Sequence, residues 1–338
     1  MRRFFSAFFI ALGLACSCST SPSVQEPMHG VVLSPDDIAD YDWPGLASRC
    51  GINTIGVHLL PSQVAAFLHS GRGRSFLHDC DSLGIIVEYQ LHALSEFLPR
   101  ELFSEDSTMF RMDGEGRRTP DFNCCVHSEK ALETIAGNAA AYVRQMPSGN
   151  HRYYFWVDDD KPMCSCPSCS EFSDSEQALI VENRMLAAIR QVDPAARLAH
   201  LAFQATMPAP RKVEPEEGIF LEFAPIHRVW DRPLSDTSAV SYRAKVMSHG
   251  QNLRYLRDNL EVFDATDAVV LEYWLDSSLA SRWHKPAVEP FWHKEVCASD
   301  MATYASYGIR NITTFAVYMD STYFSVFPTT PVEEYGAL

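Results

Sequence analysis

The chain is short of positive charge. Its 338 residues include 28 Lys and Arg against 43 Asp and Glu, which gives a formal net charge of −15 at pH 7. A protein that binds a nucleic-acid backbone needs a basic surface to neutralise the phosphates. The composition therefore argues against DNA and RNA as partners. An acidic surface of this kind suits neutral or cationic ligands.

Three other features are missing. No glycine-rich phosphate loop follows the first predicted strand, where a doubly wound nucleotide-binding sheet ordinarily carries one. The histidines that end predicted strands are scattered, at His58, His92 and His227, so they do not form the cluster that a metal-dependent hydrolase needs. After the N-terminal segment, no apolar run is long enough to cross a bilayer. These absences disfavour a nucleotide-type open sheet and a metal-dependent hydrolase.

Residues 1–18 have the features of an export signal. A basic start, Met1-Arg2-Arg3, precedes a short apolar run that ends in Gly13-Leu14-Ala15-Cys16. This ending resembles the lipobox of bacterial lipoproteins, in which the cysteine is lipidated, so Cys16 is the expected anchor and Cys18 the second candidate. Residues 19–28 are polar and are expected to form a tether. We therefore expect an exported, monomeric protein of the outer membrane or periplasm that touches the membrane only through this lipid.

The remainder, residues 29–338, alternates between strand-like and helical segments and is expected to form one catalytic domain. Four of the strand-like runs are preceded by Gly-Ile, in which the glycine ends a helix with a positive φ. Eight such strands over roughly three hundred residues fit a (β/α)8 barrel, and a doubly wound sheet is the alternative. The predicted strands are 29–33, 54–59, 83–92, 153–157, 197–204, 218–226, 268–276 and 311–318.

Helices are predicted between these strands from their caps and periodicity. Ser34-Pro35-Asp36-Asp37 has an N-cap, a proline at the first helical position and acids in the first turn, and Ser173 with Glu176 forms a capping box. Further helices are expected over 128–146, 242–263 and 294–307. The long segment 93–123 lacks such a pattern, and we expect it to cover a binding site as a lid.

The fourth predicted strand runs directly into three acids, Asp158, Asp159 and Asp160. In a barrel the carboxyl ends of all the strands face one mouth, where catalytic groups gather. Carboxylates dominate the polar residues placed there, and a pair of carboxyl groups is what glycosidic cleavage requires. A solvated turn or helix cap would also explain the three acids, and a buried ion pair with arginine would explain Glu222 and Glu272. The full set is His58, Glu88, Gln90, His92, Asp158, Asp159, Asp160, Gln204, Glu222, His227, Arg228, Glu272, Asp276, Thr314 and Asp320.

A cysteine cluster follows the acids. Cys164-x-Cys166-x-x-Cys169 has the spacing of a zinc knuckle, and either Cys125 or His127 could supply a fourth ligand. Because an exported chain meets oxidising conditions, disulfides are the alternative, and free thiols are a third. In each case the cluster would hold the loop that carries the acids. No catalytic cofactor is expected, and structural zinc at this cluster is the only candidate metal.

Six motifs stand out, at residues 88–94, 98–103, 109–113, 123–128, 156–169 and 220–226. Together they resemble the bacterial domain-of-unknown-function family 4838, which is glycoside-hydrolase-like and related to glycoside hydrolase family 163. The similarity covers most of the chain after the tether. The resemblance implies a (β/α)8 barrel and, for the characterised relatives, retaining endo-β-N-acetylglucosaminidase action on complex N-glycans. The positions it carries over are His92, Asp158, Asp159 and Glu222.

These observations favour an exported glycoside hydrolase. Asp159 would be the general acid/base, its pKa raised by the neighbouring Asp158 charge. Either Glu272 is the nucleophile, or the acetamido group of the substrate attacks and Asp158 orients it. The expected substrate-binding residues are His92, Glu88, Trp156, Glu222, Tyr273, Trp274 and Asp276. The alternative is a carbohydrate-binding lipoprotein that keeps the barrel and lacks catalysis.

Overall fold

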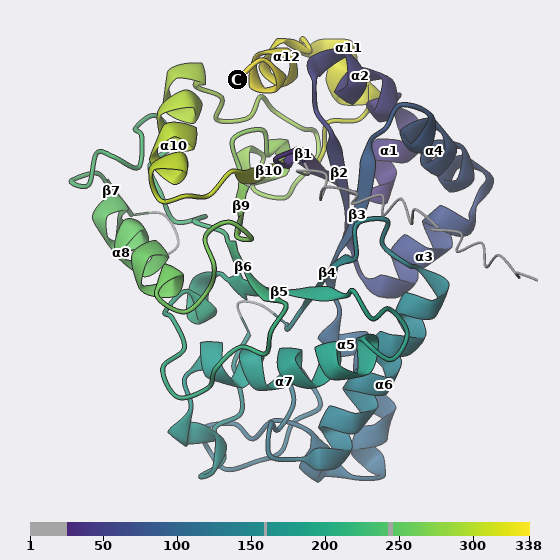
Figure 1. The fold of residues 1–338 in the computed structure, drawn as a ribbon, viewed down its shortest axis with the longest axis vertical. Helices are drawn as coiled ribbons and strands as arrows, with labels where there is room; N and C mark the ends of the chain where they lie inside the picture. The colour runs from purple at the N-terminus through teal and green to yellow at the C-terminus, as the bar shows by residue number, and fades with distance from the viewer. Residues whose placement is uncertain (1–25, 159–160, 243–245) are drawn as a thin grey trace, which may run out of the picture.

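The computed structural model describes residues 26–158, 161–242 and 246–338. In these residues eight parallel strands close into a barrel in the order β1-β10-β9-β6-β5-β4-β3-β2, as seen down its axis in Figure 1. The predicted (β/α)8 barrel is confirmed, and closure of the sheet excludes the doubly wound alternative. The strands are β1 His29–Leu33, β2 Thr54–Leu59, β3 Ile86–His92, β4 Arg152–Trp156, β5 Arg197–Ala202, β6 Ile219–Phe223, β9 Val269–Glu272 and β10 Asn311–Phe315.

Helices surround the barrel (Figure 1). Several are the predicted ones, and none in the described part of the chain is long and apolar enough to cross a membrane. The α-helices are α1 Pro35–Asp40, α2 Trp43–Cys50, α3 Pro61–His69, α4 Gly71–Ser82, α5 Leu94–Phe97, α6 Glu129–Gln145, α7 Asp174–Ile189, α8 His249–Leu260, α9 Ser277–Ala280, α10 Lys294–Ser306, α11 Ser321–Val326 and α12 Thr330–Gly336.

The local signals that place these elements act as the sequence predicts. Ser34 caps α1 in a capping box with Asp37, and Ser173 caps α7 with Glu176. The glycines of the four Gly-Ile pairs, Gly51, Gly84, Gly218 and Gly308, have φ between 70° and 96°. Side chains other than glycine rarely adopt this conformation. Gly51, Gly84 and Gly308 each turn the chain from a helix into the next strand, as predicted, whereas Gly218 turns it from a loop into β6.

Two predicted helices differ from the structure, and several strands are shorter than predicted. The first helix is two helices, because Asp42 caps a new one at Trp43 and Pro44 cannot continue the hydrogen bonding of α1. The helix predicted over 242–263 begins only at His249. A short antiparallel pair, β7 Val240–Ser241 and β8 Met247–Ser248, precedes it, and Ser248 supplies its cap.

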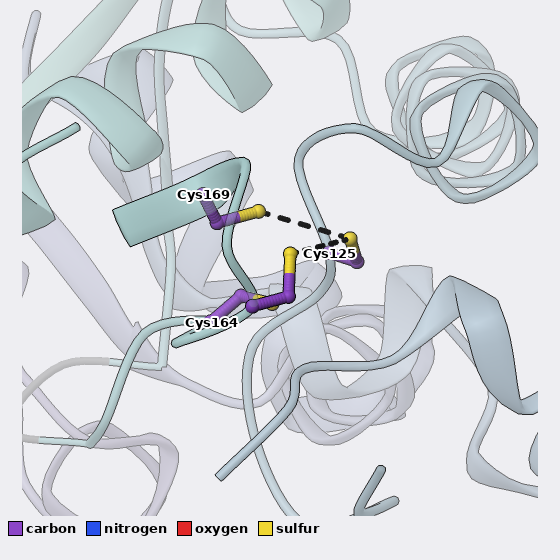
Figure 2. Close-up of side chains that lie close together, drawn as sticks. Cys125, Cys164 and Cys169 are labelled. Atoms are coloured by element: carbon purple, nitrogen blue, oxygen red, sulfur yellow. Dashed lines mark hydrogen bonds between the residues drawn. The ribbon is translucent and has the colours of Figure 1, made fainter. Parts of the chain in front are cut away.

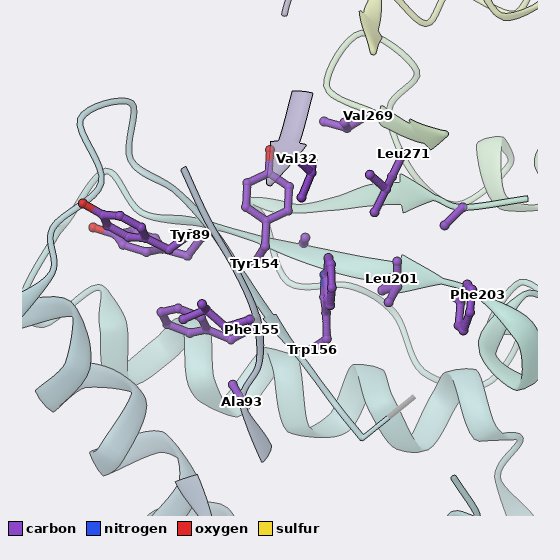
Figure 3. Packing of buried hydrophobic residues seen from close by; sticks show 14 of the residues in the cluster. Val32, Tyr89, Ala93, Tyr154, Phe155, Trp156, Leu201, Phe203, Val269 and Leu271 are labelled. Atoms are coloured by element: carbon purple, nitrogen blue, oxygen red, sulfur yellow. The ribbon is translucent and has the colours of Figure 1, made fainter. Parts of the chain in front are cut away.

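The barrel interior is filled in layers, as expected for this fold. Tyr154 and Trp156 of β4 point inward toward Val32, Leu201 and Leu271, whereas Phe155 points outward onto the helices (Figure 3). Near the amino ends of the strands, the Arg152 guanidinium lies 3.9 Å from the centre of the Phe220 ring. Polar groups occupy the middle layer, and an aromatic layer closes it above.

The long segment between β3 and α6 is folded rather than loop-like. It contains α5 and two 3-10 turns, Arg100–Ser104 and Ser107–Met109. The Asn123 side chain accepts a hydrogen bond from the Asp158 amide at 3.0 Å and donates to the carbonyls of Asp158, Lys161 and Pro162. None of residues 93–123 lines the cavity described next. The segment braces the loop after β4 instead of covering the site as a lid.

Candidate active site

A cavity of about 960 Å³ opens at the carboxyl ends of the barrel strands. All eight strands, or the residues directly after them, contribute to its wall. Aromatic side chains supply much of the lining, and a few polar groups lie among them. The residues are Ser34, Asp36, His58, Leu59, His92, Trp156, Leu201, Phe203, Gln204, Ile226, His227, Trp230, Leu271, Tyr273, Asp276, Ser278, Leu279, Arg282, Trp283, Phe315, Val317 and Tyr318.

The floor of the cavity is an aromatic cluster. The rings of His58, His92 and Trp156 lie 4.9 to 5.4 Å apart, and Phe315 joins His58 to Tyr273 at 5.1 and 5.2 Å. His58 Nδ1 lies 2.9 Å from the Gln90 carbonyl, which can only accept, so Nδ1 carries the proton. Flat apolar surfaces with a few oriented polar groups are suited to a ligand that has one apolar and one polar aspect, such as a sugar ring.

Asp276 is the buried carboxyl group of the described cavity wall. Its Oδ1 caps α9 by accepting from the Leu279 amide at 3.0 Å and from the Ser278 hydroxyl at 2.6 Å. Burial raises the pKa of Asp276 to about 6, although these hydrogen bonds oppose the rise. A carboxyl group with this pKa holds a proton near neutral pH more readily than an exposed aspartate does. It can therefore serve as a proton donor to a ligand in the cavity.

Strained backbone gathers at the rim. Among the described residues, five other than glycine have a positive φ, and four of them line the cavity: Gln204, Arg282, Trp283 and Tyr318. Trp283 is 61% exposed. The Tyr318 hydroxyl donates to the Trp283 carbonyl at 3.2 Å, and the Asp37 carboxylate accepts from the Tyr318 amide at 3.0 Å. Such conformations persist only where contacts hold them, and they concentrate at functional sites.

Two of the predicted acids lie inside the barrel, beneath the floor. Glu222 accepts a 2.7 Å hydrogen bond from the Trp156 indole, and Glu88 accepts one of 2.7 Å from Asn150. Both are fully buried, and burial raises both pKa values. Neither lines the cavity. Glu222 therefore orients Trp156 from below, and Glu88 belongs to the polar middle layer with Gln90.

Two of the predicted site residues, Glu272 at the end of β9 and Trp274 just after it, face away from the cavity. Glu272 accepts from Arg228 at 2.8 Å and from the Tyr304 hydroxyl, and Trp274 Nε1 donates to Asp300 at 3.3 Å. This buried network joins the barrel to α10. The placement favours the structural interpretation of Glu272, a buried ion pair, over its predicted role as nucleophile, and Trp274 packs rather than contacting a ligand in the cavity.

Of the three acids after β4, the described residues include only Asp158. The Asp158 carboxylate lies 3.8 Å from Arg100 and does not line the cavity, so this geometry does not favour it as the group that orients a substrate. Asp159 and Asp160 lie outside the described residues, and the role of Asp159 stays a prediction. From the predicted set, the structure brings together His58, His92, Trp156, Gln204, His227, Tyr273 and Asp276.

Sequence reasoning missed much of the wall. Asp36 was interpreted only as a helix-start acid, although it follows β1 at the mouth. Phe203, Trp230, Phe315 and Tyr318 were not among the candidates, because an apolar residue near a strand end gives no sign of which way it faces. Their position within two or three residues of a strand's carboxyl end is the signal that could have found some of them.

The closed barrel, with an aromatic cavity at the carboxyl ends of its strands, defines a (β/α)8 domain with a candidate binding site at its mouth. The chain belongs to the family described as "Domain of unknown function (DUF4838)", whose model matches residues 72–269. The resemblance to this family that the motifs indicated is thus confirmed. No curated protein matches the chain.

Similar solved structures include three carbohydrate-active enzymes. The tandem GH20 catalytic modules of the pneumococcal exo-β-D-N-acetylglucosaminidase StrH match at 10% identity over 91% of this chain and 82% of that one, with a TM-score of 0.46. A chitinase from Rhizomucor miehei matches at 9% identity over 90% of this chain and 99% of that one, with a TM-score of 0.49. The endoglucanase Cel5A of Thermobifida fusca matches at 13% identity over 91% of this chain and 85% of that one, with a TM-score of 0.45. At such identities the likeness is one of barrel shape.

Proposed function

We propose that this protein is a glycoside hydrolase that binds a neutral glycan in the cavity at the barrel mouth. The observation that carries the proposal is the combination of a large aromatic cavity with a buried carboxyl group, Asp276, whose pKa of about 6 suits proton transfer. Aromatic faces bind the apolar faces of sugar rings, and a carboxylic acid can protonate the leaving glycosidic oxygen.

The catalytic pair in this proposal is Asp276 and Asp159. β9 and β4 are separated by β6 and β5 in the eight-stranded barrel, so their carboxyl ends lie at separate places around the mouth. Asp276 follows β9, and Asp159 follows Trp156 of β4 by three residues. Glycosidases place their two carboxyl groups on either side of the scissile bond. The raised pKa gives Asp276 the acid/base role in this proposal, the role predicted for Asp159 from the sequence, and Asp159 is then the second carboxyl group.

The finer substrate follows from the resemblance described under Sequence analysis. It favours cleavage at N-acetylglucosamine in complex N-glycans, by an endo-acting and retaining reaction. Export and lipid anchoring at Cys16 belong to the same proposal, because surface display gives access to external glycans. Residues 1–25 lie outside the described residues.

The test is a screen for hydrolysis of N-glycopeptides and chitooligosaccharides, with released sugars identified by mass spectrometry. Asp159→Asn is expected to lower kcat by about 10²- to 10⁴-fold, because it removes one of the two catalytic carboxyl groups. Asp158→Asn is the matched control, because Asp158 pairs with Arg100 outside the cavity, and it should stay within about tenfold of the wild type. Glycan binding with no product from any substrate would instead support the sugar-binding alternative.

The exposed rim tryptophan gives a second prediction. Replacing Trp283 with alanine should raise KM by about 2- to 10-fold, since an aromatic contact is worth about 0.5–1.5 kcal/mol. The change in kcat should be smaller, because the ring lies at the rim. Steady-state kinetics measure both values. Tyr242→Ala removes an aromatic ring that is 76% exposed and does not line the cavity, and it should leave KM unchanged.

A further inference from the structure

Four cysteine sulfurs converge beside the loop that follows β4. The Sγ atoms of Cys125, Cys164, Cys166 and Cys169 all lie within 4.8 Å of one another, and all four residues are buried. Figure 2 shows the side chains of Cys125, Cys164 and Cys169 converging from two separate segments. The sulfur of Cys125 lies 3.7 Å from that of Cys169 and 3.9 Å from that of Cys166.

These distances match a single tetrahedral metal ion. With Zn–S bonds of about 2.3 Å, tetrahedral geometry places neighbouring sulfurs about 3.8 Å apart. In a multinuclear iron–sulfur cluster the four cysteines are divided among two or four irons, so sulfurs bound to different irons lie farther apart than sulfurs around a single ion. Two disulfides would require the four sulfurs to separate into two bonded pairs, whereas Cys125 is almost equally distant from two partners.

The surroundings of the sulfurs suit thiolates. The Met112 amide donates to the Cys164 sulfur at 3.3 Å, and Arg118 Nη1 lies 3.6 Å from the same atom. The Gln177 side chain accepts from the Cys164 amide and donates to the carbonyls of Cys164 and Cys169, each at 3.2 Å. Donors of this kind stabilise metal-bound thiolates and fix their orientation.

We propose that Cys125, Cys164, Cys166 and Cys169 bind one structural zinc ion. The ion joins the segment before α6 to the loop between β4 and α7. Cys125 is two residues from Asn123, whose side chain bonds the backbone of Asp158, Lys161 and Pro162. The zinc therefore fixes the base of the loop that carries the acids. A four-thiolate site has no open position for a substrate, so its role is structural.

The experiment is a metal analysis of the full-length protein purified without a metal-affinity step. Inductively coupled plasma mass spectrometry should find about one zinc per chain. Cobalt exchanged into the protein should give the visible absorption bands of a tetrahedral thiolate complex. This result needs no variant and no substrate, so it is independent of the proposed glycosidase activity.

A matched pair of variants locates the ion. Cys125→Ser should lose the zinc and increase hydrogen exchange in residues 161–170, whereas Cys124→Ser, at the adjacent buried cysteine outside the cluster, should keep both at wild-type values. Two results would overturn the proposal. One is a metal-free wild-type protein whose mass is lowered by two disulfides, and the other is iron in place of zinc.

Discussion

Replacing Asp276 with asparagine is expected to lower kcat on a cleavable glycan by about 10²- to 10⁴-fold. The substitution removes the proton that the carboxyl group can donate and keeps its shape. Asparagine is also a good N-cap, so its oxygen can still accept from the Leu279 amide and preserve α9. The loss should therefore appear in turnover at unchanged melting temperature. Asp36→Asn, at the exposed acid of the same cavity, is the matched control and should change kcat little.

The same residue sets an expected pH dependence. Burial raises the pKa of Asp276 to about 6, so the group is protonated below that pH and ionised above it. If Asp276 is the acid, kcat/KM falls as pH rises through about 6, and Asp276→Asn abolishes this limb. A pH profile of the wild type and the variant measures this. Equal turnover and identical profiles in the two proteins would reduce Asp276 to a helix cap.

The barrel was predictable because local signals repeat along the chain. Three of the four Gly-Ile pairs end a helix, and all four start a strand. The apolar, β-branched composition of the strands indicates burial on both faces. The direction of a side chain is not encoded in the same way. Glu222 lies between Leu221 and Phe223, and Glu272 lies between Leu271 and Tyr273. Glu222 points into the barrel and Glu272 points out. Because both faces of a barrel strand are apolar, the neighbouring residues do not indicate which direction each glutamate takes.

The site was predictable only in part for the same reason. His92, Trp156 and Asp276 could be placed at the mouth because they end strands or follow them. The cysteine spacing indicated three sulfurs and left the fourth partner open between Cys125 and His127. The choice depends on the path of residues 110–125, which a bridge between Phe110 and Cys124 fixes. Long-range contacts of this kind leave no periodic pattern in the sequence.

Arg228→Met is expected to destabilise the fold by about 3–5 kcal/mol, because it removes the one cation from a buried acidic pair. Arg228 Nη1 lies 2.8 Å from Glu272 and Nη2 2.5 Å from Asp300, and all three side chains are fully buried. Without the guanidinium, two carboxylates face each other away from water. Urea unfolding measures the loss. Arg232→Met, four residues away at a pair with Asp236 that is largely exposed on the arginine side, should cost less than about 1 kcal/mol.

Neutralising Glu272 and Asp300 as well as Arg228 shows how much of the lost stability is due to unpaired charge and how much to packing. Arg228→Met combined with Glu272→Gln and Asp300→Asn should recover much of the lost stability, because no unpaired charge then remains buried. Glu272→Gln alone also tests the nucleophile prediction. A structural Glu272 predicts a less stable enzyme whose folded fraction keeps its kcat, whereas a nucleophile predicts a folded enzyme that has lost turnover. If Arg228→Met unfolds at the wild-type urea concentration, the network does not hold α10 to the barrel.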